Sequence, residues 1–315
     1  MFSTVIYPIT DQLTLTAGGR YTHEQKKYTF FRYKLDGTVN DPALQGVSSS
    51  ARNGVVDYRV SLDYRFNPSL LAYATISTGF KGGGINPLPF TAAVALPFGP
   101  EKLTNYELGF KSDLLDRRLR LNVTGFYDDY KQVQETRLSC PEFGLVFCSL
   151  VVNAGNAHTK GIEAELAARP TQGLQFDASF SYIDFQFTKL NPSTFLPLSS
   201  VPPFVPKYKW SLGAQYRIEM GSAGALTPRI DGAYQSSIFT NAANAATNQI
   251  APYTVWNAHL TWDYAPQQLS VALHVSNLFN KYYFLNKFDV VGFTGTIDAD
   301  PARPREFAVV VRKAF

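Results

Sequence analysis

The sequence has no apolar run long enough to form a membrane-spanning helix. Its mean hydropathy is −0.12. The longest apolar runs, AAVALPF at 92–98 and FAVVV at 307–311, are far shorter than the roughly 18 residues that a helix needs to cross a bilayer. Few windows show the periodicity of an amphipathic helix. A helical membrane protein is therefore excluded.

Residues that often carry catalysis or bind metals are also scarce. The 315-residue chain has only two Cys and four His, and it contains no C-x-x-C, G-x-S-x-G or H-E-x-x-H motif. The histidines show no spacing that would gather them on a metal ion: His23, His158, His259 and His274. The net charge of +4 is too dispersed for a nucleic-acid surface. We therefore expect no cofactor, no metal site and no nucleic-acid partner.

The residues that are abundant favour strands. Phe (24) and Tyr (18) far outnumber Trp (3) and Met (2), while 22 Gly and 19 Pro are spread over the whole length. Length alone would suggest about two domains. No change of composition marks a boundary, however, so we treat residues 1–315 as one domain.

Apolar and polar side chains alternate along many segments. Residues 59–66 read RVSLDYRF, and the same alternation runs through 210–219, 256–264 and 269–276. A soluble antiparallel sheet would give the same pattern. Charges in the middle of these strands are costly facing lipid and ordinary facing a water-filled lumen. The pattern is thus compatible with an antiparallel transmembrane β-barrel.

The connections decide between these alternatives. Short turn-like segments rich in Pro, Gly, Asn or Asp occur at 8–12, 67–69, 115–118, 170–173, 221–224 and 265–268. Long irregular segments lie between them, at 35–52, 81–100, 138–150, 188–206, 240–252 and 285–304. Such alternation is typical of outer-membrane barrels and not of sandwiches or propellers, and it predicts about thirteen strands.

Several segments resemble one family in particular. NLFNKYYF at 277–284 resembles the NLFDKKY signature near the end of TonB-dependent outer-membrane receptors, and PREFAVVVRKAF at 304–315 resembles their closing strand. Further pieces resemble the same barrel in the same order: LTLTAGGRYTHE at 13–24, STGFKGGGIN at 77–86, LTNYELGFKSDLLDRRLRLNVTGFYDDY at 103–130 and VNAGNAHTKGIEAELAARP at 152–170. The resemblance covers nearly every residue from Leu13 onward.

The resemblance implies a barrel of about 22 strands that is closed by an N-terminal plug. In this family the TonB-ExbB-ExbD motor pulls on the plug to import ferric siderophores, haem, cobalamin or sugars. This chain would supply the C-terminal strands of the barrel, with plug and early strands missing, because it begins directly in strand-like sequence without a signal segment. The implied location is the outer membrane of a Gram-negative bacterium. Lys26 and Lys27 would then meet lipopolysaccharide phosphates or an anionic ligand.

Five acidic or cysteine side chains are the candidate site residues. By resemblance, Glu107, Glu163 and the weaker companion Glu165 match barrel carboxylates that pair with plug arginines; alternatively, they only line a hydrated wall. Cys140 and Cys148 lie in one long loop. At this spacing in an oxidising compartment, we expect a loop disulfide rather than a metal or redox pair.

The last strand carries the remaining candidates. Phe307, Val309, Val311 and Phe315 share one parity, which Lys313 interrupts. By resemblance, this strand is the recognition signal for the barrel-assembly machinery. Phe315 also fits a girdle of aromatic side chains at the membrane interface.

The leading functional hypothesis is an energised outer-membrane importer, and a ferric siderophore or similar iron chelate is the expected ligand. One alternative is a passive porin-like channel. Another is an outer-membrane barrel enzyme, which would need catalytic side chains near the outer rim. The ligand itself is not readable, because specificity lies in the external loops and the plug.

Overall fold

A single open antiparallel sheet dominates the computed structural model, which describes residues 2–145 and 148–314. The sheet has fourteen strands. Thirteen follow one another in space, consistent with the predicted number: β1 (Phe2–Pro8), β2 (Leu13–Phe30), β3 (Val47–Asn67), β4 (Leu70–Lys81), β7 (Glu101–Leu114), β8 (Leu119–Arg137), β9 (Leu150–Ala168), β10 (Leu174–Leu190), β11 (Tyr208–Tyr216), β13 (Ala225–Gln235), β16 (Tyr253–Tyr264), β17 (Leu269–Ser276) and β20 (Glu306–Lys313). The short β12 (Ile218–Glu219) also pairs with β13.

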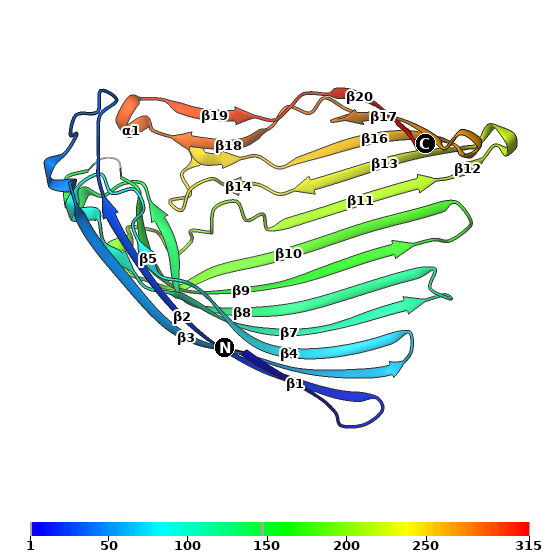
Figure 1. Ribbon diagram of the computed structural model, residues 1–315, viewed down its shortest axis with the longest axis horizontal. Coiled ribbons are helices and arrows are strands. Elements are labelled where there is room, and N and C mark those ends of the chain that lie inside the picture. The colour runs from blue at the N-terminus through cyan, green and yellow to red at the C-terminus, as the bar shows by residue number, and fades with distance from the viewer. Residues whose placement is uncertain (1, 146–147, 315) are drawn as a thin grey trace.

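Tight turns and long loops gather at opposite ends of this sheet (Figure 1). We call these the turn end and the loop end. At the turn end, for example, β7 and β8 are joined by residues 115–118, where Leu115, Asp116 and Arg117 all have positive φ. The loop end holds three small two-stranded sheets: β5 (Gly84–Ile85) with β6 (Pro97–Phe98), β14 (Ile238–Phe239) with β15 (Gln249–Ile250), and β18 (Phe284–Asp289) with β19 (Ile297–Pro301). The predicted alternation of short and long connections is confirmed.

Helical segments are short and lie in the connections. Among the described residues there is a single α-helix, α1 (Val291–Thr294). Seven 3₁₀ turns lie in other connections: η1 (Pro42–Leu44), η2 (Ala92–Val94), η3 (Pro141–Phe143), η4 (Pro192–Thr194), η5 (Gly221–Ala223), η6 (Ala246–Asn248) and η7 (Ala265–Gln267). Within residues 2–145 and 148–314, no helix has the length and hydrophobicity to cross a membrane.

The two faces of the sheet carry different side chains. On one, the polar face, Ser61 and Thr75 are only 2% and 4% exposed. On the other, the apolar face, Val56 and Leu108 are 68% and 67% exposed. A water-soluble sheet would show the reverse. Since a concave surface crowds its side chains, the low exposure identifies the polar face as the concave side of the curved sheet (Figure 1).

The sheet does not close on itself among the described residues. Its path ends at β1 on one side and at β20 on the other. All seven residues of β1 and all eight of β20 are exposed. Unpaired backbone groups at an edge are readily joined by further strands, so these two edges are where additional strands would pair.

Candidate functional site

The polar face is the candidate functional surface, because strand register brings its side chains into contact across neighbouring strands. Tyr73 on β4 donates a 2.5 Å hydrogen bond from its hydroxyl to Oε1 of Glu107 on β7. The same hydroxyl lies 2.9 Å from Oγ1 of Thr124 on β8. The Nζ atom of Lys111 lies 5.6 Å from the centre of the Tyr73 ring. Glu107 is therefore held by the wall itself.

Glu163 and Glu165 differ from Glu107 in having no such partner. They lie on β9 directly opposite Thr124 and Asn122 of β8, so all three glutamates project from the polar face. Both side chains are exposed, and the structure gives them no hydrogen bond or ion pair within the part of the chain that it describes. They are thus available to accept hydrogen bonds from a cationic group inside the barrel.

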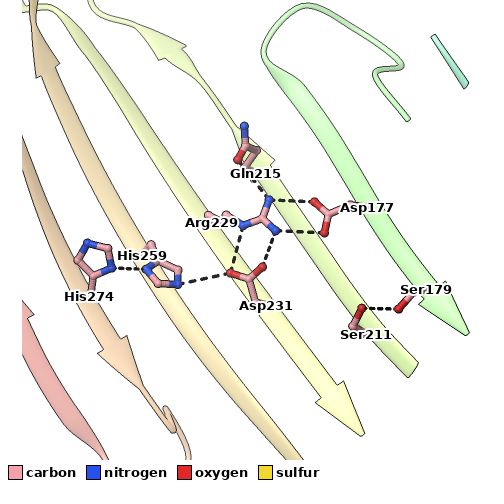
Figure 2. A network of polar contacts seen from close by, with 8 residues as sticks. All are labelled: Asp177, Ser179, Ser211, Gln215, Arg229, Asp231, His259 and His274. Atoms are coloured by element: carbon pink, nitrogen blue, oxygen red, sulfur yellow. Dashed lines mark hydrogen bonds and ion pairs between the residues drawn. The ribbon is translucent and has the colours of Figure 1, made fainter. Parts of the chain in front are cut away.

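Arg229 on β13 forms a second network that sequence reasoning did not predict (Figure 2). Its guanidinium donates to both carboxylate oxygens of Asp177 on β10, at 2.9 and 3.1 Å. It also donates to both oxygens of Asp231 at 2.5 and 3.1 Å, and to the amide oxygen of Gln215 at 3.3 Å. Bidentate, charge-assisted bonds of this kind hold both carboxylates in fixed positions. The polar parity was visible in the sequence, but the register was not.

Two histidines extend this network. The expectation that the histidines are scattered was wrong for His259 and His274. The pairing of β16 with β17 places the two residues directly opposite each other. Their Nδ1 atoms are 2.5 Å apart, and Nε2 of His259 lies 3.5 Å from Oδ2 of Asp231 (Figure 2). Fifteen residues separate them in the sequence, so only the hairpin register brings them together.

The loop end is tied together by amide side chains. Nε2 of Gln134 on β8 donates to the carbonyl oxygens of Gly82 and Gly99 at 3.1 and 3.0 Å. The side chain of Asn153 on β9 accepts from N of Gly99 and donates to its carbonyl oxygen, at 2.7 and 2.9 Å. The connection between β4 and β7 is thereby fastened against β8 and β9.

The loop between β8 and β9 is cross-linked. Cys140 and Cys148 form a disulfide whose Cα atoms are 5.9 Å apart, and both residues are fully buried. Nearby, the buried Arg137 donates to both oxygens of Glu142 at 2.7 and 2.9 Å, which lowers the pKa of that carboxyl. The Arg137 guanidinium also lies 4.9 Å from the centre of the Phe195 ring. The described residues of this loop are therefore held by a disulfide and a bidentate ion pair.

Asn277, in the motif NLFNKYYF, links two loop segments by hydrogen bonds. Its backbone has a φ of 50°, a left-handed conformation that Asn tolerates better than most residues. Its side-chain amide donates to the carbonyl oxygens of Lys281 and Arg303, at 2.9 and 3.2 Å. The segments before β18 and β20 are thus joined through one side chain.

Two sequence predictions concern the surface toward the membrane. Lys26 and Lys27 were expected to meet lipopolysaccharide or an anionic ligand. Lys26 lies on the polar face, away from lipopolysaccharide, where it donates a 2.8 Å hydrogen bond to the carbonyl oxygen of Gly83; the alternation places Lys27 on the apolar face. Three residues of β20 lie on the apolar face and are 63–68% exposed: Phe307, Val309 and Val311. Phe315 lies outside the described residues.

Comparisons with known proteins agree on one family. The family model for "TonB dependent receptor-like, beta-barrel" matches residues 2–278. The pesticin receptor of Yersinia pestis is 27% identical over 282 residues, which are 90% of this chain and 39% of that protein. The ferrichrome outer membrane transporter/phage receptor of Escherichia coli is 27% identical over 285 residues, 90% of this chain and 34% of that protein.

Solved structures show the same fold. The ferric yersiniabactin uptake receptor FyuA from Yersinia pestis superposes with a TM-score of 0.82 at 23% identity, covering 100% of this chain and 45% of that one. The siderophore receptor PiuA from Acinetobacter baumannii gives a TM-score of 0.74 at 18% identity, with 98% and 42% covered. The chain thus spans less than half the length of these relatives and structures.

Proposed function

We propose, from the premise that this chain belongs to the TonB-dependent receptor β-barrel family, that it forms part of the wall of an energised importer of metal chelates. It is an outer-membrane protein of a Gram-negative bacterium, and the named relatives are receptors and transporters rather than enzymes. The observation that carries the proposal is the family match over 2–278 on a wall that is polar inside and apolar outside. The proposed ligand class is a ferric siderophore.

The two open edges support a larger barrel. Further strands would pair with β1 and β20, and a plug would fill the space beside the polar face. In bacterial barrels, short turns face the periplasm and long loops face outward. The loop end would then form the external vestibule that first meets the ligand. The same orientation supports a recognition role of β20 for the barrel-assembly machinery and contact of Lys27 with lipopolysaccharide.

Energised uptake is expected to depend on the full-length gene and on TonB. The probes are radioactive iron bound in ferric yersiniabactin, ferrichrome or ferripyoverdine, which are the chelates named for relatives or similar structures. We predict that deleting the gene abolishes accumulation of iron from one of these three chelates. Complementation should restore accumulation in cells with TonB and not in cells without it. Uptake that persists without TonB and rises linearly with concentration would instead indicate a passive channel.

A plug-contact role for the wall carboxylates is a separate proposal. Glu163 and Glu165 are exposed, acidic and unpaired within the described wall, which suits them to hold plug arginines. The double variant Glu163→Gln/Glu165→Gln should loosen the plug, because neutral amides bind guanidinium groups more weakly than carboxylates do. We predict a several-fold rise in the entry of vancomycin into intact cells.

The matched control is Glu219→Gln. Glu219 is also an exposed carboxylate, but it lies at the turn end and is paired with Arg217. Its neutralisation should leave vancomycin entry unchanged. If the double variant reaches the cell surface in normal amounts and admits no more vancomycin than Glu219→Gln, the carboxylates only line a hydrated wall.

A further inference from the structure

The paired histidines have the geometry of a partial metal site. His259 and His274 meet across β16 and β17 with ring centres 4.6 Å apart and rings at 80° to each other. Their Nδ1 atoms face each other at 2.5 Å, within one hydrogen bond on the polar face, so both nitrogens border the same small volume. Both side chains are only partly buried, so water and dissolved ions can reach them.

The carboxylate of Asp231 favours the tautomer of His259 in which Nδ1 is free to bind. Asp231 lies 3.5 Å from Nε2 of His259 and is itself held by two hydrogen bonds from Arg229. A proton on Nε2 faces this carboxylate, which leaves the lone pair on Nδ1. Metal-binding histidines usually donate their other ring N–H to a carboxylate, which orients the ring; here the 3.5 Å ion-pair contact places a carboxylate on that side of His259.

Arg229 of β13 lies directly opposite His259 on one side, whereas the side toward β20 leaves room for further ligands. The β20 residue opposite His274 is Ala308, and the next polar-face position on β17 is Ala272; neither side chain can reach over the imidazoles. No cluster of three or more His, Cys, Asp or Glu side chains able to hold a metal occurs within residues 2–145 and 148–314. The remaining coordination positions would therefore be taken by water or by a small dissolved ligand.

We propose that His259 and His274 bind one late divalent transition-metal ion, such as Cu²⁺, Ni²⁺ or Zn²⁺, through their two Nδ1 atoms, with Asp231 as the positioning residue. Imidazole favours these ions, whereas Mg²⁺ and Ca²⁺ favour oxygen ligands. Binding moves the proton of His274 from Nδ1 to Nε2. The two nitrogens must also separate to about 3 Å, because each bond to the metal is roughly 2.0–2.1 Å long.

Copper provides the sharpest test, because nitrogen ligands split the electron paramagnetic resonance signal of Cu²⁺. The reference protein is the full-length receptor in detergent, without an affinity tag, carrying His23→Gln and His158→Gln. The pair then supplies the only histidines of these 315 residues, which have four, and the further double variant His259→Gln/His274→Gln measures what the rest of the receptor binds. We expect one Cu²⁺ per molecule, with splitting from two imidazole nitrogens.

Variants then separate the ligands from the positioning residue. His259→Gln or His274→Gln removes one of the two nitrogen ligands, so each should weaken copper binding more than Asp231→Asn does and remove the two-nitrogen splitting. Asp231→Asn should weaken binding by about 10-fold and leave the splitting in place. Each variant is checked for folding by testing whether it resists unfolding in detergent at low temperature.

Two results would overturn the site. One is a reference protein that binds no stoichiometric Cu²⁺ or shows fewer than two coordinated nitrogens, a result that needs no folded variant. The other is copper binding that survives His274→Gln unchanged. Since the probe is the metal ion alone, neither result bears on the uptake of chelates. Conversely, a receptor that took up none of the chelates would still be expected to bind copper.

Discussion

Replacing Leu212 with arginine is expected to lower the free energy of unfolding in a lipid bilayer by about 2–4 kcal/mol, the cost of a cationic side chain near the middle of a barrel's lipid-facing surface. Leu212 is the central residue of β11, between Tyr208 and Tyr216, and its side chain is 46% exposed on the apolar face. Urea titration of the full-length protein in vesicles measures the change.

The neighbouring residue supplies a matched control. Ser211 precedes Leu212 and faces the opposite way, where its hydroxyl lies 2.7 Å from that of Ser179. Ser211→Arg places the same charge at the same depth but in the water-lined interior. Its cost should be limited to about 1 kcal/mol, the value of one lost hydrogen bond. Equal losses for the two variants would refute the assignment of the faces.

Removing the Arg229 guanidinium is expected to destabilise the wall by about 2–3 kcal/mol, because Arg229→Ala leaves Asp177 and Asp231 facing each other without a cation. The Arg229 side chain is 26% exposed. We therefore place the effect below that of breaking a fully buried ion pair, typically about 3–5 kcal/mol. The midpoint of urea unfolding of the full-length protein is the measurement.

The variant Arg217→Ala tests whether the stabilisation by Arg229 depends on burial and geometry or on charge alone. Arg217 also contacts two carboxylates, those of Glu219 and Asp263, but its side chain is 45% exposed at the turn end. Exposed ion pairs of this kind contribute about 0–1 kcal/mol. If Arg229→Ala lowered the urea midpoint no more than Arg217→Ala does, the network of Figure 2 would not stabilise the wall.

Local features of the sequence were sufficient for the fold class. The alternation in 59–66 and 210–219 assigned residues to faces, since side chains on a strand alternate regardless of what the strand pairs with. Turn residues such as those at 115–118 located the hairpins, and these two signals together gave the strand number. The long loop from 138 to 150 also held both cysteines, which form its cross-link.

The alternation loses its meaning where an extra residue interrupts the register of a strand. Between Tyr130 and Val133 the register of β8 against β9 shifts, and Gln132 has a φ of 58°. Beyond this irregularity, Val133, Gln134 and Glu135 are all buried, so parity no longer tells the two faces apart.

Along the regular strands, the sequence by itself determined which side chains meet lipid and which meet water, because a period of two is a property of each strand alone. Only the tertiary structure decided which polar side chains meet one another. The contacts of Tyr73 with Glu107, of Arg229 with Asp177 and of His259 with His274 each join different strands. Their existence depends on register, which turns and bulges set one hairpin at a time.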